Sequence, residues 1–463
     1  MKGFLVAGAA SGVGKTTVVL AIAAALRRRG HTVQPFKGGP DFLDAGHHSR
    51  ICGRAARNLD TWMLSPEANR DVLRHAAHGA DVLLVEGMMG LFDGKDGGAE
   101  TGSSAQIAKL LKLPAVLVLD AAKTARSIAA VALGFELFDP GLQLSGIILN
   151  RVAGERHFRM LREAIEAACK TPVLGWLPRE PAIAIPERHL GLQTAEEGET
   201  GDALDRQIDT LASLAEEHLD LPRLLGFECG LDLEPEAPSV RRQPAAPVRI
   251  GVTRDKAFSF HYEDNFDLLE RRGATLLPFS PMGDACLPPN LDALYLAGGY
   301  PELYAEQIGG NFALLSAIRR FVESGRPVYA ECGGMIFLSR RLTTADGAIH
   351  PMAGVLPFDI EMTDRLVGFG YVEVDLTHDC LLGKAGATFR GHSFHYSRIS
   401  NETSLATNYR VRYSISGRTE QEGYRLGNVL ASYVHLHFRA APGSAGSFVE
   451  AALAARNANP VSR

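Results

Sequence analysis

Short apolar runs alternate with amphipathic segments through the first half of the chain. Consecutive apolar positions are typical of strands buried on both faces of a sheet. The strands predicted on this basis are 4–7, 82–85, 115–119 and 146–149. Residues 16–29 and 157–169 space their apolar positions three and four apart, which predicts helices. This alternation predicts an α/β domain with a parallel sheet covered on both faces.

The pattern changes around residues 226–247, where proline and charged residues replace the periodic apolar positions. We interpret 231–246 as a linker between one domain at 1–230 and a second at 247–455. A chain of 463 residues is long enough for two or three domains. In the second domain, the strands predicted from apolar runs are 248–252, 294–297, 328–330 and 432–435.

The composition argues against two classes of binding partner and favours one kind of cellular compartment. Lys and Arg total 48 against 53 Asp and Glu, and this net charge of −5 argues against nucleic-acid and membrane-surface partners. The six cysteines are scattered without a C-x-x-C pair, which favours a reducing compartment. Lys15 and several small residues interrupt the first apolar run, unlike a signal peptide. We therefore expect a cytoplasmic protein without a membrane span.

Residues 8–17 read GAASGVGKTT and connect a predicted strand to a predicted helix. Five residues separate Gly8 from Gly14, one more than in the usual phosphate loop. Small residues still let backbone N–H groups face phosphate oxygens at the start of a helix. Lys15 would reach the terminal phosphates and Thr16 would bind Mg²⁺. The residues predicted to bind ATP are Gly12, Gly14, Lys15, Thr16 and Thr17.

Carboxylates follow predicted strands at the edge of the sheet where ligands bind. Glu86 ends the strand at 82–85, and Asp93 follows in a glycine-rich loop. A second loop, KGGPDFLDAGHH, carries Asp41 and Asp44. The residues predicted to hold Mg²⁺ are Thr16, Glu86 and Asp41; each carboxylate could instead be a solvated loop charge. Asn150 ends the strand at 146–149, where its amide would contact adenine or make a strand-end turn.

The motif VYAECGGM at 328–335 predicts a nucleophilic cysteine. A strand meets Cys332, two glycines and a helix, so the thiol is exposed at a tight strand-to-helix turn. A nucleophilic thiol needs a base. SYVHLHF at 432–438 offers His435 and His437, which share a face if the segment is one strand. Backbone N–H groups of Gly299 and Gly333 would form the oxyanion site.

Two other interpretations of this region remain open at the level of sequence. Cys332 could be a buried structural cysteine. Four histidines also have spacings found among zinc ligands, although a cysteine pair or an H-E-x-x-H helix is absent from the sequence. They are His392, His395, His435 and His437.

Several motifs together resemble one known family. GAASGVGKTT, FKGGPDFLD, NLDTWM, VEGMMGLFDG and PERHLGL resemble cobyrinic acid a,c-diamide synthases, and VYAECGGM and SYVHLHF resemble their class I glutamine amidotransferase domain. The motifs occur in the expected order over nearly the whole chain. The resemblance implies an N-terminal P-loop amidoligase domain of the dethiobiotin synthetase type and a C-terminal class I amidotransferase-like α/β domain.

The resemblance also implies an activity. A ligase of this family amidates the a and c side-chain carboxylates of cobyrinate in cobalamin biosynthesis, using ATP, an acyl phosphate and glutamine or ammonia. By motif position it implies catalytic roles for Asp41, Glu86, Asp93, Cys332 and His435, and substrate contacts by Phe42, Leu43 and Asp44. Mg²⁺ is the implied cofactor, and a homodimer is a further expectation.

The sequence departs from the family pattern at two positions. Phe42 stands where the family commonly has Tyr, and His437 stands where ordinary class I amidotransferases have Glu two residues after the base. The substrate also stays open, because the same chemistry would serve hydrogenobyrinate or nickel sirohydrochlorin. An alternative from another class is a P-loop nucleotide switch with a non-catalytic C-terminal binding module.

Overall fold

The computed structural model describes residues 1–180, 187–188, 191–192, 195, 202–233, 247–401, 404–441 and 443–458. The chain forms two compact units, Met1–Pro238 and Ser239–Arg463, and each is described by itself. Most of the predicted linker lies outside the described residues, as do Pro186, His189 and Leu190 of the PERHLGL motif. In the remainder of that motif, β8 (Glu187–Arg188) pairs antiparallel with β9 (Gly191–Leu192).

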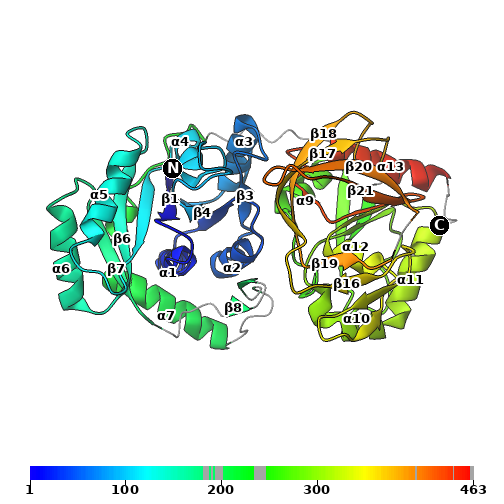
Figure 1. Ribbon diagram of the computed structural model, residues 1–463, viewed down its shortest axis with the longest axis horizontal. Coiled ribbons are helices and arrows are strands. Elements are labelled where there is room, and N and C mark those ends of the chain that lie inside the picture. Colours follow the sequence, from blue (N-terminus) through cyan, green and yellow to red (C-terminus); the bar gives the residue numbers. More distant parts are fainter. Residues whose placement is uncertain are drawn as a thin grey trace. The chain divides into compact units, whose positions relative to one another are not determined.

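The first unit is built on a seven-stranded sheet of order β3-β2-β4-β1-β5-β6-β7 (Figure 1). All neighbouring strands run parallel, as the apolar runs predicted. The strands are β1 (Lys2–Gly8), β2 (Val33–Gly38), β3 (Arg57–Leu59), β4 (Val82–Gly90), β5 (Ala115–Asp120), β6 (Leu144–Val152) and β7 (Val173–Pro178). Their carboxyl ends meet at one edge, where ligands bind in open α/β sheets.

Helices cover both faces of this sheet, with α1, α2 and α7 on one side and α3 and α4 on the other (Figure 1). Helix α1 carries a long run of buried aliphatic and alanine residues because it lies between the sheet and α7. The helices are α1 (Lys15–Arg28), α2 (Leu43–Cys52), α3 (Pro66–Ala77), α4 (Ser104–Leu110), α5 (Ile128–Phe138), α6 (Glu155–Glu166), α7 (Asp202–His218) and α8 (Leu221–Leu224).

The second unit contains a ten-stranded mixed sheet of order β11-β10-β12-β13-β22-β21-β20-β17-β18-β23. The first five strands of that order are parallel and the other half is antiparallel. The strands are β10 (Val248–Thr253), β11 (Ala274–Phe279), β12 (Ala293–Leu296), β13 (Val328–Glu331), β17 (Gly368–Leu376), β18 (Thr388–His395), β20 (Ala406–Tyr413), β21 (Thr419–Leu426), β22 (Val429–Ser432) and β23 (His435–Leu436).

A small sheet and several α-helices complete the part of the second unit that the structure describes. The sheet has the order β15-β14-β16-β19. Its strands are β14 (Arg341–Thr343), β15 (Ile349–Pro351), β16 (Ile360–Met362) and β19 (Ser397–Ile399). The helices are α9 (Glu263–Arg271), α10 (Ala305–Gly310), α11 (Phe312–Glu323), α12 (Gly333–Leu338) and α13 (Ser444–Ala458), and a 3-10 turn spans Pro301–Tyr304.

The predicted single strand at 432–435 is wrong. Strand β22 ends at Ser432, and β23 begins at His435 on the other side of the sheet order. Two side chains cause the break: Ser432 Oγ accepts the N–H of Val434 at 3.0 Å, and a Glu422 carboxylate oxygen accepts the N–H of Tyr433 at 2.6 Å. These contacts take both N–H groups out of the strand ladder and let His435 pair with β18.

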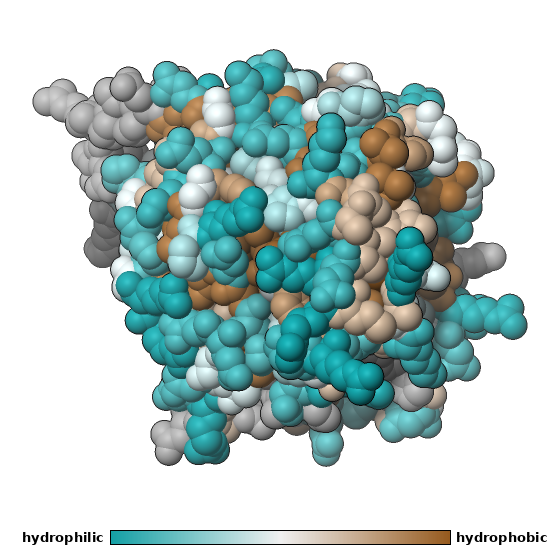
Figure 2. Space-filling view, turned by 90° about the vertical axis from the view of Figure 1, so that its left-hand side faces the viewer, coloured by the Kyte–Doolittle hydropathy of each residue, from teal (hydrophilic) through white to brown (hydrophobic). Residues whose placement is uncertain are grey.

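One end of the first unit exposes apolar side chains among hydrophilic ones (Figure 2). Val131, Leu137 and Phe138 of α5 and Met160 of α6 are exposed there. Across the described residues, no helix combines the length and the apolar character needed to cross a membrane.

Candidate functional site

The phosphate loop runs between β1 and α1 and depends on two glycines in left-handed conformations. Gly12 and Gly14 have φ values of 78° and 86°. A side chain on Gly14 would also collide with Asn150, since an added Cβ would lie 2.1 Å from Asn150 Nδ2. Asn150 Nδ2 donates to the Val13 carbonyl at 2.9 Å, so the end of β6 holds the loop in place. The adenine contact of Asn150 stays a prediction.

Lys15 and Thr16 begin α1 and face the buried interior of the loop. Lys15 Nζ donates to the Ala10 carbonyl at 3.3 Å, and burial, with repulsion from Lys37, lowers its pKa. Thr16 Oγ1 donates to Glu86 Oε1 at 2.8 Å and lies 3.4 Å from Asp44 Oδ1. Thr17 follows on the helix and is partly buried. The structure therefore brings Thr16, Glu86 and Asp44 together beside the loop.

A buried charge cluster joins β2, α2 and β4. Lys37 Nζ lies 2.5 Å from Asp44 Oδ2 and 3.0 Å from Glu86 Oε1, and His48 Nε2 lies 2.6 Å from Glu86 Oε2. Burial disfavours the charged forms of Lys37 and Glu86. The carboxylates of Asp44 and Glu86 nevertheless raise the pKa of Lys37. In turn, Lys37 and His48 lower the pKa of Glu86. Opposite charges at hydrogen-bonding distance outweigh desolvation.

Lys37 and His48 were not predicted as site residues. A signal for Lys37 was its place directly before the glycines of the KGGPDFLD segment. A signal for His48 was its spacing of four from Asp44, which puts both side chains on one face of α2.

The other predicted carboxylates, Asp41 and Asp93, bond to backbone N–H groups of their own loops. Asp41 Oδ1 accepts the N–H of Asp44 at 3.0 Å at the start of α2, and burial and Asp44 raise the pKa of Asp41 to about 7. Phe42 caps α2 and Leu43 is its first residue, both partly buried. Asp93 is exposed and its Oδ2 accepts the N–H of Gly90 at 2.8 Å.

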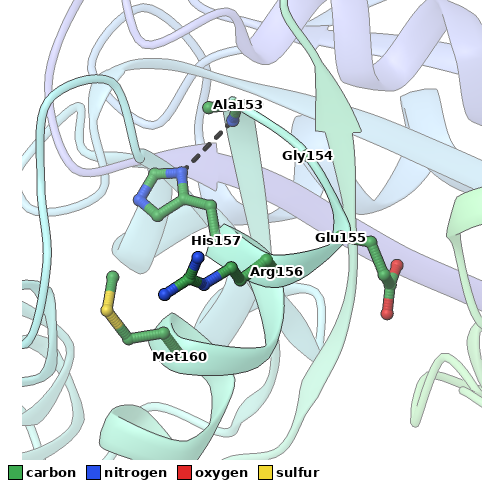
Figure 3. A pocket seen from close by; sticks show the side chains of 6 residues that line it. All are labelled: Ala153, Gly154, Glu155, Arg156, His157 and Met160. Carbon is green, nitrogen blue, oxygen red and sulfur yellow. Dashed lines mark hydrogen bonds between the residues drawn. The ribbon is translucent and has the colours of Figure 1, made fainter.

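A shallow pocket of about 510 Å³ lies past the carboxyl end of β6, three residues after Asn150 (Figure 3). His157 shapes it, because its Nδ1 accepts the N–H of Ala153 at 3.2 Å and its Nε2 lies 2.8 Å from the Thr124 carbonyl. The lining residues are Ala153, Gly154, Glu155, Arg156, His157 and Met160. This is the edge of the sheet at which open α/β folds bind ligands.

Cys332 occupies the predicted strand-to-helix turn between β13 and α12. Its φ of 44° and ψ of −102° are unusual for a residue with a side chain, and such strain is found at functional sites. The turn is held because the N–H of Cys332 donates to the Ser432 carbonyl at 2.7 Å. The structure thus supports the predicted strand-to-helix turn. The predicted exposure of the thiol is wrong, because the turn is packed into the core of the unit and Cys332 is buried.

His435 lies beside Cys332 although the two are far apart in sequence. Burial lowers the pKa of His435, but interactions with the Cys332 thiol and the Glu331 carboxylate outweigh burial and raise the pKa to about 9. His435 Nδ1 lies 3.6 Å from Glu331 Oε2, and its ring stacks on His392 with centroids 4.9 Å apart. Glu331 and His392 were not predicted to belong to this site.

Three glycines leave room for these groups. A Cβ on Gly298 would lie 2.3 Å from His435 Cε1, and a Cβ on Gly333 would lie 2.8 Å from the Gly299 nitrogen. Gly299 has a φ of 155°, and its Cβ would collide with the Ala257 carbonyl. The predicted oxyanion glycines, Gly299 and Gly333, therefore lie against each other beside the thiol turn. Their role as donors stays a prediction.

The zinc alternative finds no support. His392 Nδ1 lies 3.0 Å from the Tyr262 hydroxyl, and His395 Nδ1 lies 2.8 Å from the Ser397 carbonyl. The ring of His437 packs against Tyr262. Within the described ranges, no group of three or more His, Cys, Asp or Glu residues could hold a metal ion.

Known proteins match both units. Residues 4–192 match the family model described as "CobQ/CobB/MinD/ParA nucleotide binding domain", and residues 249–443 match "CobB/CobQ-like glutamine amidotransferase domain". A cobyrinate a,c-diamide synthase of Syntrophotalea carbinolica is 44% identical, over 96% of this chain and 97% of its own length. The chain belongs to the cobyrinate a,c-diamide synthase family.

Other members of the family match over a similar length. The cobyrinate a,c-diamide synthases of Listeria monocytogenes (strain F2365) and Salmonella typhimurium are each 41% identical, over 95% of this chain and 96% and 95% of their own lengths. The family resemblance and the two-domain α/β fold are thereby confirmed. A C-terminal match to a glutamine amidotransferase domain argues against the alternative of a nucleotide switch with a non-catalytic binding module.

Proposed function

We propose that this chain is an ATP-dependent cobyrinate a,c-diamide synthase, a carbon–nitrogen ligase of cobalamin biosynthesis. It amidates the a and c side-chain carboxylates of cobyrinate with nitrogen from glutamine or ammonia. The observation that carries the proposal is the full-length match to synthases in both units, with a phosphate loop in one and an adjacent Cys332–His435 pair in the other.

The first unit activates the substrate. A substrate carboxylate oxygen attacks the γ-phosphorus of ATP, ADP leaves, and an acyl phosphate forms; ammonia then displaces phosphate at the acyl carbon. Backbone N–H groups of the loop and the ammonium group of Lys15 stabilise the charge on the transferred phosphoryl group. Lys37 holds Asp44 and Glu86 beside Thr16 and limits their net negative charge. Asp41, Phe42 and Leu43 are proposed to contact the substrate, and Asp93 to assist transfer.

The oxygen atoms near the phosphate loop suit Mg²⁺. Thr16 Oγ1, Glu86 Oε1 and Asp44 Oδ1 converge within hydrogen-bonding range, and Mg²⁺ prefers such hard oxygen donors while keeping phosphate and water ligands. Bound there, the ion would neutralise charge on the ATP phosphates. Asp41 was predicted as a ligand; Asp44, rather than Asp41, has the contact with Thr16.

The pocket beside the end of β6 is proposed to take the base or ribose of ATP. Asn150 links this strand end to the phosphate loop through the Val13 carbonyl. A nucleotide whose phosphates lie on that loop can therefore reach Asn150 and the pocket that begins at Ala153.

The second unit releases ammonia. Cys332 Sγ attacks the glutamine amide carbon, His435 gives a proton to the departing ammonia, and water hydrolyses the thioester to glutamate. Gly299 and Gly333 are proposed to donate N–H groups to the oxyanion. The raised pKa of His435 supports this assignment, since an imidazolium can supply the proton at neutral pH.

Mutation of the thiol separates the two half-reactions. Cys332→Ala should abolish glutamine-dependent diamidation of cobyrinic acid and preserve the reaction driven by ammonium chloride. Cys286→Ala, at an exposed cysteine of the same unit, is the matched control and should retain both. Loss of the ammonia-driven reaction in Cys332→Ala would contradict this division of labour.

Substrate comparison tests the finer assignment. Cobyrinate, hydrogenobyrinate and nickel sirohydrochlorin are incubated separately with ATP and glutamine, and ADP release and amide formation are measured. Cobyrinate should give the highest kcat/KM. A higher kcat/KM for either alternative would reassign the substrate but keep the chemistry. The homodimer and the cytoplasmic location remain predictions.

A further inference from the structure

The base of the amidotransferase site lacks the glutamate that ordinary class I amidotransferases carry two residues further on. His437 occupies that position. Its ring packs on Tyr262 with centroids 4.6 Å apart, and its Nδ1 accepts the N–H of Arg439 at 3.3 Å. His437 cannot supply a carboxylate, so another group must orient His435.

Glu331 is a carboxylate in contact with His435. It is the last residue of β13, is fully buried and directly precedes Cys332. Its Oε2 lies 3.6 Å from His435 Nδ1. Three donors fix its carboxylate: Tyr329 Oη at 2.6 Å and the Leu436 N–H at 3.1 Å bond to Oε1, and Tyr295 Oη at 3.2 Å bonds to Oε2. Strands β12, β13 and β23 thus hold Glu331 in one place.

We propose that Glu331 is the positioning residue of the glutamine-hydrolysing site, which holds the His435 ring through Nδ1 and so directs Nε2 to the Cys332 thiol. The assignment rests on the proposed function, because it concerns only the glutamine half-reaction. In this assignment the acid directly precedes the nucleophile in the sequence, instead of following the base. An acid on Nδ1 fixes the ring orientation and tautomer and stabilises the imidazolium that forms.

A second buried carboxylate nearby provides a matched control. Glu422 bonds to the Ser432 hydroxyl at 2.5 Å, the Tyr433 N–H at 2.6 Å and the Gly423 N–H at 2.6 Å. Burial raises its pKa to about 7. Glu422 therefore shapes the chain between β22 and β23, whereas Glu331 faces the base itself.

The groups around His435 make the pH dependence of glutamine hydrolysis a specific readout. Besides Cys332 and Glu331, the titratable neighbours are His392 and His395. Burial lowers the pKa of His392 well below its usual value and that of His395 to about 4, so both are neutral near pH 7. Glu331 is the acidic neighbour that favours the His435 imidazolium. Removing its charge should therefore lower the pKa of His435.

The test measures glutamine hydrolysis by the full chain, with ATP and cobyrinic acid present, across pH 6–10. Glu331→Gln should lower kcat by at least about 10-fold with little change in KM for glutamine. It should also move the alkaline limb of the pH profile to lower pH. Glu331→Asp should recover part of kcat. Glu422→Gln should keep the wild-type pH profile, and ammonia-driven diamidation should be unchanged in all three variants.

Two results would overturn the assignment of Glu331. One is a kcat for Glu331→Gln equal to that of the wild-type chain. The other is a loss of kcat with the alkaline limb unmoved, which indicates a merely structural role. A wild-type chain that is inactive with ammonium chloride as well as glutamine would instead refute the proposed function, and the Glu331 assignment with it.

Discussion

Gly298→Ala is expected to disable the glutamine site through one added carbon. Gly298 has no positive φ, so alanine is compatible with its backbone. The new Cβ would, however, lie 2.3 Å from His435 Cε1 and 3.2 and 3.3 Å from the two ring nitrogens. Ordinary carbon–carbon contact begins near 3.5 Å, so the ring must retreat by about 1 Å. A displacement of about 1 Å costs about 100-fold in rate, or about 2.7 kcal/mol in the barrier.

The assay compares glutamine hydrolysis with ammonia-driven diamidation in the same preparation. Gly298→Ala should lose about 100-fold in the first activity and retain the second. Gly310→Ala is the matched control: Gly310 ends α10 without a positive φ, and an added Cβ meets no atom within 4 Å. A Gly298→Ala variant that folds and hydrolyses glutamine within twofold of wild type would refute the inferred closeness of Gly298 and the catalytic base.

Three further predictions concern the first unit. Lys37→Met leaves two buried carboxylates without their cation, so the free energy of unfolding in urea at pH 7 should fall by about 3–5 kcal/mol. The fold raises the pKa of Asp41 to about 7. Ionisation of this carboxyl therefore costs folding free energy, and the cost is absent below about pH 4, grows between pH 4 and 7, and is complete above pH 7. The free energy of unfolding of Asp41→Asn in urea should therefore exceed that of wild type by at least about 1 kcal/mol at pH 8. The difference between the two proteins should be smaller at pH 5. Asn150→Ala removes the donor to the buried Val13 carbonyl and should raise KM for ATP about tenfold, with a smaller change in kcat.

The parallel sheets were predictable where burial on both faces gave continuous apolar runs. Strand β2 (Val33–Gly38) departs from that pattern, because its sequence VQPFKG is entirely buried yet contains the polar residues Gln34 and Lys37. Gln34 is tolerated since its amide donates to the Pro35 and Ala55 carbonyls. The split between β22 and β23, in contrast, was not predictable from the sequence. One of the two side chains that cause it, Glu422, lies on a different strand.

The site residues also divide into those that the local sequence predicts and those that only the fold reveals. Lys15, Thr16 and Cys332 were predictable because their chemistry is set by a short local pattern of glycines between a strand and a helix. Their partners come from distant segments that only the fold brings together. Glu331 lies inside the VYAECGGM motif, but its role was not predictable, because one carboxylate at a strand end has the same local sequence whether it orients a base or faces solvent.

Strand register explains why these partners meet in both units. Lys37 of β2 is directly opposite Glu86 of β4, and Glu331 of β13 is directly opposite Ser432 of β22. Because successive side chains of a strand point to opposite faces, a slip of one residue would carry either carboxylate to the wrong side of its sheet. Both reactive loops start at the carboxyl ends of parallel strands, and the charged partners come from those ends or the adjoining turns. The apolar residues that pack each sheet therefore also fix the geometry of its candidate site, since they determine the register.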